Sequence, residues 1–137
     1  MTRLLAGFLA LFLGVTAAGA PVAEEGDGFL VRVLLETEEP VYELSCAYEL
    51  DGEPVGEWGV CAANGRSPLG GEVFNLFRME DFPEGADLSS FSMRFSLTTA
   101  VDGELCPVEN EFSVPAAYGA TCRVTILGSA EGGYRAE

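Results

Sequence analysis

The sequence predicts a mainly β protein, a small antiparallel β-sandwich of about seven strands with two disulfides. Three observations indicate this class. Short apolar or alternating segments recur between turns rich in glycine, proline and acidic residues. No segment has the sustained periodicity of an amphipathic helix. The four cysteines are an even number in a chain that resembles an exported protein, and an oxidising compartment favours disulfides over a metal site.

The first twenty residues have the features of a secretory signal peptide. Arg3 supplies a positive charge, an uncharged apolar run covers 4–15, and small residues follow at 17–20. The cleavage position stays open between 18 and 23. Because the apolar run is shorter than the roughly 20 residues of a membrane helix, we expect no membrane span after signal cleavage. The expected location is extracellular or periplasmic.

The charge and composition exclude several classes of function. The chain has 22 acidic and 7 basic residues and no histidine, with a formal net charge of -15. Such a surface repels phosphate backbones and anionic lipids, which argues against nucleic-acid and membrane-surface partners. Without histidine, no Ser-His-Asp or Cys-His arrangement and no His-containing zinc site can form. We expect no enzyme, no catalytic residue, no cofactor and no metal site.

The mature chain is long enough for one domain, expected over 29–128 and stapled by the disulfides, with a flexible tail over 129–137. The first strand is expected over 29–36; it is apolar on both faces, as in a central strand. Pro40 ends the following turn. A second strand over 42–50 alternates apolar and polar residues, and a return strand over 57–62 carries Trp58, expected in the core.

The register of this first hairpin has two solutions. A two-residue turn at Asp51-Gly52 places Cys46 opposite Glu57. A wider loop over 51–56, which Pro54 and Gly56 favour, places Cys46 opposite Cys61. We prefer the wider loop and a Cys46–Cys61 bridge.

The second half of the chain predicts three further strands and one broken strand. A fourth strand is expected over 72–79, followed by an acidic turn over 80–87. The clearest alternation in the chain lies over 91–98. It predicts Phe91, Met93, Phe95 and Leu97 inside and Ser92, Arg94 and Ser96 outside. After a hairpin signal at 101–103, a segment interrupted by prolines covers 104–114, and a last strand is expected over 120–127.

Two groups of side chains have alternative interpretations. Glu80, Asp81, Glu84 and Asp87 could supply oxygen ligands to calcium, but they lack the ordered spacing of a calcium loop, and a solvated acidic turn is favoured. Tyr42, Tyr48 and Trp58 could form an aromatic platform for carbohydrate, but their inward alternation favours core packing.

The candidate partner-binding segment is Pro107, Val108 and Glu109, directly after Cys106. A disulfide followed by proline stiffens a loop, and a rigid, extended loop binds with little loss of conformational entropy, as in protease inhibitors. The alternative is an irregular strand edge in which proline blocks aggregation.

Residues 29–63, and more loosely 101–122, resemble the Streptomyces subtilisin inhibitor-like family of secreted serine-protease inhibitors. The similarity lies in the apolar first strand, in Leu44-Ser45-Cys46, Gly52, Pro54 and Cys61-Ala62, and later in Val101-Asp102-Gly103 and Tyr118 before Cys122. The resemblance implies Cys46–Cys61 and Cys106–Cys122 disulfides. It also implies that the bond between Val108 and Glu109 is presented to a secreted serine protease.

A second similarity is to an immunoglobulin-like domain. Residues 42–48 around Cys46, then Trp58, then Gly119-Ala120-Thr121-Cys122 resemble the Cys-Trp-Cys arrangement of that fold. This resemblance implies a Cys46–Cys122 bridge between two sheets. The expected function is therefore a non-enzymatic, exported domain that binds another protein. The two versions are an inhibitor of an extracellular serine protease and an immunoglobulin-like recognition or accessory domain of the cell envelope.

Overall fold

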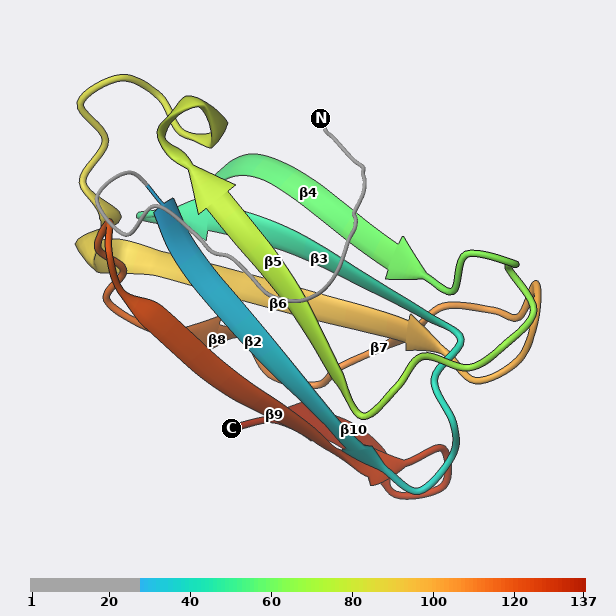
Figure 1. Ribbon diagram of the computed structural model, residues 1–137. Coiled ribbons are helices and arrows are strands. Elements are labelled where there is room, and N and C mark those ends of the chain that lie inside the picture. The colour runs from blue at the N-terminus through green and yellow to red at the C-terminus, as the bar shows by residue number, and fades with distance from the viewer. Residues whose placement is uncertain (1–27) are drawn as a thin grey trace.

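The computed structural model describes residues 28–137, which form a mainly β structure of two packed sheets (Figure 1). The predicted signal peptide lies outside these residues. The seven expected segments overlap eight of the nine strands, because the segment broken by prolines holds both β7 and β8, and the predicted sandwich class is confirmed. Their bounds are β2 Gly28–Thr37, β3 Glu43–Leu50, β4 Glu53–Cys61, β5 Glu72–Arg78, β6 Phe91–Thr98, β7 Cys106–Pro107, β8 Phe112–Ser113, β9 Thr121–Ser129 and β10 Gly133–Ala136. Two short 3-10 helices, η2 Met79–Asp81 and η3 Leu88–Ser90, lie between β5 and β6.

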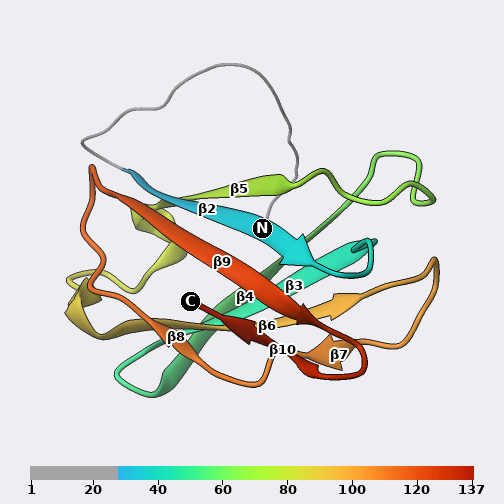
Figure 2. The same ribbon diagram turned by 90° about the horizontal axis from the view of Figure 1, so that it is seen from below.

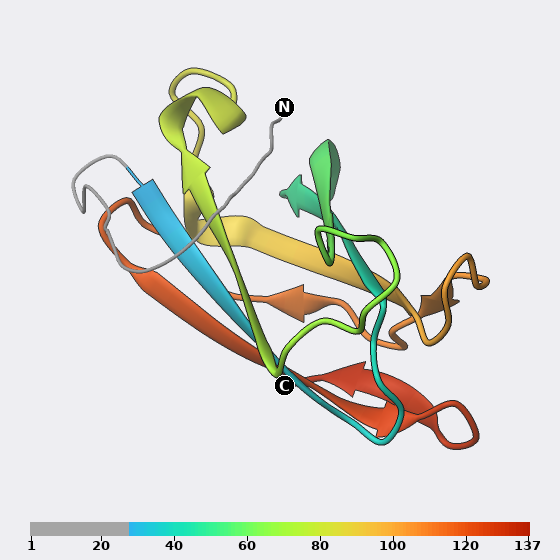
Figure 3. The same ribbon diagram turned by 45° about the vertical axis from the view of Figure 1, so that its right-hand side comes forward.

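The two layers are separate when the molecule is turned (Figures 2 and 3). The first sheet has the strand order β10-β9-β2-β5, and the second has the order β4-β3-β6-β7, with β8 also pairing β6. The first and last long strands of the described chain, β2 and β9, therefore lie side by side at the centre of the first sheet.

The expectation of a wholly antiparallel sheet is wrong at this centre. Strands β2 and β9 are parallel, with Leu30 opposite Thr121 and Thr37 opposite Gly128. The hairpins that join β3 to β4, β6 to β7 and β9 to β10 are antiparallel, as their short loops require. The parallel pair joins strands that are distant in the sequence, so the intervening chain is long enough to provide the crossover.

The predicted register of the first hairpin is also wrong. A two-residue turn joins β3 to β4, with Asp51 at φ 54 and Gly52 at φ 80. These positive φ values define the turn that an Asp-Gly pair favours, because its twist matches that of the flanking strands. A bulge between Tyr48 and the following residue then shifts the pairing by one. Pro54 lies on β4, an edge strand, where its missing N–H costs no ladder bond.

This register excludes the preferred Cys46–Cys61 bridge. Cys46 lies opposite Trp58 and is buried, whereas Cys61 lies opposite Glu43 and is exposed. The two cysteines are three positions apart along the pair, roughly 10 Å, and point to opposite faces, which a disulfide cannot span.

The expected two-disulfide framework is not present in the structure. All four cysteines, Cys46, Cys61, Cys106 and Cys122, are free thiols. Neither the Cys106–Cys122 pairing nor the Cys46–Cys122 pairing is formed. Burial raises the pKa of Cys46 well above its usual value, and burial also raises the pKa of Cys122. Both thiols therefore behave as small apolar core residues.

The core confirms the alternation predicted for β6. Phe91, Met93, Phe95 and Leu97 are all buried, with at most 1% exposure. Aromatic rings join the two sheets: Tyr48 on β3 lies with its ring centroid 4.7 Å from that of Phe77 on β5. Such edge-on pairs add to the stabilisation from area burial alone.

Two predictions about individual side chains need correction. Ser92 was expected outside but is 6% exposed, because Glu111 covers it and accepts a 2.8 Å hydrogen bond from its hydroxyl. Trp58 packs edge-on against Phe95, with ring centroids 6.4 Å apart, yet is only half-buried because β4 is an edge strand. Tyr48 is buried, in agreement with core packing.

The expected flexible tail over 129–137 is instead part of the first sheet. β9 continues to Ser129, and β10 pairs back onto it with Tyr134 opposite Gly128. Tyr134 is 2% exposed and Ala136 is 5% exposed, so the hairpin closes one end of the core. A glycine is required at 128, because its φ is 117 and a side chain there would overlap the carbonyl of Gly133.

Candidate functional site

The predicted partner-binding segment lies between the two sheets rather than in a presented loop. Val108 is 7% exposed, and its N–H donates a 2.9 Å hydrogen bond to the carbonyl of Phe95 in the second sheet. The N–H of Glu109 donates a 2.8 Å bond to the carbonyl of Tyr134 in the first sheet. Consecutive residues of one segment therefore join β6 to β10.

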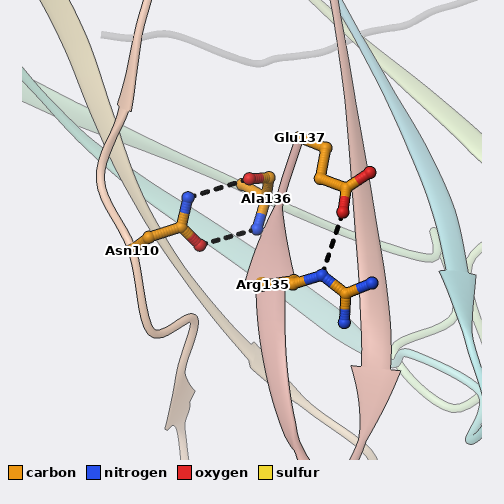
Figure 4. Close-up of polar contacts among 4 residues, drawn as sticks. All are labelled: Asn110, Arg135, Ala136 and Glu137. Carbon is orange, nitrogen blue, oxygen red and sulfur yellow. Dashed lines mark hydrogen bonds and ion pairs between the residues drawn. The ribbon is translucent and has the colours of Figure 1, made fainter.

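The next residue strengthens the same connection (Figure 4). The amide of Asn110 donates to the carbonyl of Ala136 at 2.8 Å and accepts from its N–H at 2.9 Å. These two hydrogen bonds replace those of a neighbouring strand at the edge of β10. They pair the backbone N–H and carbonyl of Ala136, which would otherwise have no partner strand. The geometry agrees with the alternative interpretation, an irregular strand edge interrupted by proline.

A substrate-like loop needs an accessible residue for the specificity pocket of a protease. Pro107 and Glu109 are exposed, but Val108, the residue expected to enter such a pocket, faces the core. Binding a protease there would require the segment to leave both sheets. The structure thus brings the three predicted site residues together without presenting the central one.

The acidic turn is organised by its own backbone. The carboxylate of Asp81 accepts a 2.8 Å hydrogen bond from the N–H of Arg78, and that of Asp87 accepts one of 3.0 Å from the N–H of Ser89. The latter bond is the first cause of a lowered pKa for Asp87. Within residues 28–137 no group of three His, Cys, Asp or Glu side chains is arranged to hold a metal ion. The two acids act as caps of short turns.

A different surface emerges on the outside of the first sheet, which we call the arginine face. It is the outward side of β5, β2, β9 and β10, opposite the buried Val31, Phe77 and Cys122. The sheet directs four of the six arginines of the described residues to this side: Arg32, Arg78, Arg123 and Arg135. Leucines 30, 34, 76 and 127 and Phe74 lie between them.

The strand registers set these side chains in rows. Arg32 on β2 lies opposite Phe74 on β5 and opposite Arg123 on β9. The next row contains Leu76, Leu30 and Thr121. Both of these rows have an apolar residue at β5 and a polar residue at β9. Neighbouring strands are about 4.8 Å apart.

In the row of Phe74, Arg32 and Arg123, only one of the two arginines already has a carboxylate partner. The guanidinium of Arg32 forms an ion pair with Glu72, with Nη2 and Oε2 2.6 Å apart, and its carbon lies 5.6 Å from the centroid of the Phe74 ring. Phe74 is nevertheless 56% exposed. Arg123 is exposed and, in the part of the chain that the structure describes, its side chain has no ion pair or hydrogen bond.

Two of the three carboxylates on this face are already engaged by its arginines. Glu72 pairs with Arg32, and the Nε of Arg135 lies 2.9 Å from a carboxylate oxygen of Glu137 (Figure 4). The third, Glu36, lies opposite Leu127. The outward side of the second sheet has the opposite character, with Arg94 among Glu43, Glu49, Glu57 and Glu111. Four of the six arginines of the described residues therefore lie on one face of the first sheet, and the outward side of the second sheet is predominantly acidic.

The sequence contained part of the signal for the arginine face. Alternation in the strands over 29–36 and 72–79 separates Arg32 from Val31 and Phe74 from Val73. What it could not reveal is that β9 lies beside β2, which sets Arg123 next to Arg32, or that the last residues form a strand. The arginine face could not be predicted without knowing that β2 and β9, which are far apart in the sequence, are paired.

No family model matches the chain, and no curated protein matches it. A solved structure described as "NMR structure of the protein from Eubacterium rectale" is similar over 85% of this chain and 93% of that chain, with 16% sequence identity and a TM-score of 0.48. This likeness is too distant to support an argument about function. Within the described residues, no helix has both the length and the apolar character needed to cross a membrane.

Proposed function

We propose that this protein is an exported, non-enzymatic domain that binds another protein through the arginine face. The observation that carries the proposal is the row of Phe74, Arg32 and Arg123. In this row a large aromatic ring is 56% exposed beside the Arg32 guanidinium, and an unpaired arginine lies at the other end. Aromatic and arginine side chains are enriched where protein interfaces concentrate their binding energy. An exposed apolar patch rimmed by polar groups is a common mark of an interaction surface.

The broader of the two versions, a recognition or accessory domain of the cell envelope, has the better support. Its surface is a rigid sheet, so the contact residues are held in place before binding and little conformational entropy is lost. The protease-inhibitor version depends on Val108, and its burial gives that version no presented residue. Export is proposed from the apolar run and small residues of the first twenty positions.

The proposal of a non-enzymatic role rests on the chemistry of the side chains. The sequence contains no histidine, which removes the commonest general base. Glu111, a carboxyl group on the outward side of the second sheet, has its pKa lowered first by the hydroxyl of Ser92 and then by the side chain of Glu49 and by Arg94. A carboxyl group kept ionised on an open sheet face does not have the raised pKa of a general acid.

Site-specific photocrosslinking in the organism that makes the protein tests this proposal. A photoreactive phenylalanine analogue replaces Phe74 in one variant and Ala47 in a second variant. Ala47 is an exposed residue on the outward side of β3, in the other sheet. We expect a discrete crosslinked protein from position 74 and none from position 47. Equal crosslinking at both positions, or none at position 74, would contradict the arginine face as the binding surface.

A separate titration addresses the inhibitor version. The mature protein is titrated against subtilisin, elastase and trypsin, and we expect no inhibition at micromolar concentration. Inhibition of subtilisin or elastase would instead support the segment around Val108 as a protease-binding site.

A further inference from the structure

The charge distribution around the arginine face points to the chemistry of its partner. We infer that the face takes an acidic peptide segment in which a carboxylate side chain lies three residues from an apolar side chain. This inference rests on the proposed function and adds to it the class of partner. In this arrangement the apolar side chain of the peptide packs on Phe74, and its carboxylate pairs with Arg123.

The first step of the argument is the availability of positive charge. Arg32 and Arg135 already have carboxylate partners, whereas Arg78 and Arg123 form no ion pair within residues 28–137. Arg66, in the loop between β4 and β5, also forms no ion pair among the described residues, but it lies away from the arginine face. Acidic side chains outnumber basic ones 22 to 7 in the whole chain, so the two unpaired arginines give this face a local charge opposite to that of the molecule. A carboxylate brought to Arg123 can form the short, bidentate bonds that guanidinium groups favour.

The second step is the spacing of the row. Phe74 and Arg123 are separated by two strand spacings, because Arg32 on β2 lies between them. Two spacings amount to about 10 Å. In a polyproline II segment, residues three apart lie on the same side and are separated by about 9 Å. A peptide crossing the strands in that conformation therefore reaches both ends of the row with residues i and i+3.

The third step concerns the size of the partner. The field of the molecule's net negative charge repels long anionic polymers and anionic lipid surfaces. This charge includes Glu43, Glu49 and Glu57 on the other sheet. At physiological ionic strength this field is screened over about 8 Å. A short acidic segment that touches only the arginine face interacts chiefly with the charges in contact with it. Charge complementarity at short range thus favours a peptide.

The probe is a displayed library of random 12-residue peptides selected on the immobilised protein. We expect the selected peptides to contain Asp or Glu three residues from an apolar residue. Arg123→Glu and Phe74→Ser should each weaken binding of these peptides by about tenfold or more, and binding should weaken as the salt concentration rises. Each variant is checked for an unchanged melting temperature.

Matched controls make the same chemical changes elsewhere. Arg66→Glu reverses a charge in the exposed loop between β4 and β5, and Leu105→Ser removes an apolar side chain that is 53% exposed. Both controls should bind the selected peptides as the wild type does. Loss of binding in Arg66→Glu equal to that in Arg123→Glu would overturn the inference, since it would reveal a non-specific charge effect.

The remaining outcomes also decide the matter. Selected peptides without acidic residues, undiminished binding by Arg123→Glu, or no selected peptide at all would overturn the acidic-peptide chemistry. So would Arg123-dependent binding to phosphatidylglycerol vesicles but not to phosphatidylcholine vesicles, which would assign the face to a lipid surface. A protein crosslinked at position 74 without any selected acidic peptide would leave the proposed function standing and this inference wrong.

Discussion

The carboxylate of Glu39 accepts a 2.6 Å hydrogen bond from the hydroxyl of Tyr134, 95 residues further along the chain. The same carboxylate accepts the N–H of Ala130 at 3.0 and 3.1 Å. One side chain in the turn after β2 therefore holds both the last hairpin and the buried tyrosine of the last strand. This contact fixes the end of the chain that the sequence predicts to be a flexible tail.

This contact predicts a pH-dependent stability with two limits. The hydrogen bond from Tyr134 lowers the pKa of Glu39 below 4.5. The ionised Glu39 carboxylate therefore stabilises the fold fully above pH 4.5, and this stabilisation is lost as the pH falls through the lowered pKa. Burial, and then the bond to Glu39, raise the pKa of Tyr134 above 10.0, so its effect is complete below pH 10 and declines above it. We expect Glu39→Gln and Tyr134→Phe to have lower melting temperatures than the wild type between these limits.

Melting curves across the pH range test this prediction. The difference in melting temperature between the wild type and Glu39→Gln should narrow as the pH falls below 4.5. Glu38→Gln changes an exposed neighbour and should melt as the wild type does. A difference that stays constant down to about pH 2 would show that the ionised carboxylate contributes no stability.

A second prediction concerns the centre of the core. Phe95 on β6 is 1% exposed and packs against Trp58 on β4, in the same sheet. Phe95→Ala should lower the free energy of unfolding by about 3–5 kcal/mol, a large part of the stability of a small domain. Leu105→Ala, at a position that is 53% exposed, serves as the control and should change it little. Chemical denaturation of both variants measures the difference, and equal midpoints would contradict the assignment of β6.

A third prediction separates a structural role of Val108 from an inhibitory one. Val108→Asp places a charge in the core between β6 and β10, so we expect partial or complete unfolding by circular dichroism. Pro107→Asp introduces the same charge at the exposed neighbouring position and should leave the fold intact. A folded Val108→Asp protein with an unchanged melting temperature would show that this residue is not part of the core.

The free thiols give a fourth prediction. In the folded, reduced protein the exposed Cys61 should react first with a thiol reagent. Cys46 and Cys122 should react only on unfolding, because both are buried and burial raises the pKa of each thiol. Counting labelled cysteines by peptide mass spectrometry, before and after denaturation, measures this order. Rapid labelling of Cys46 in the folded state would contradict its position in the core.

The sequence alone determined the strands that have strong local patterns. Alternation placed Phe91, Met93, Phe95 and Leu97 inside, because successive side chains of a strand point to opposite faces and only one face can meet the core. The same reasoning located the other long strands and the sandwich class.

Tertiary structure decided the register, the pairing of strands and the candidate site. The first hairpin took the two-residue turn because Asp51 and Gly52 adopt positive φ values, and this separated Cys46 from Cys61. The parallel pairing of β2 with β9 brought Arg123 beside Arg32. Pairing over such sequence separations depends on the apolar area that whole sheets bury together, and no local pattern of residues records that quantity.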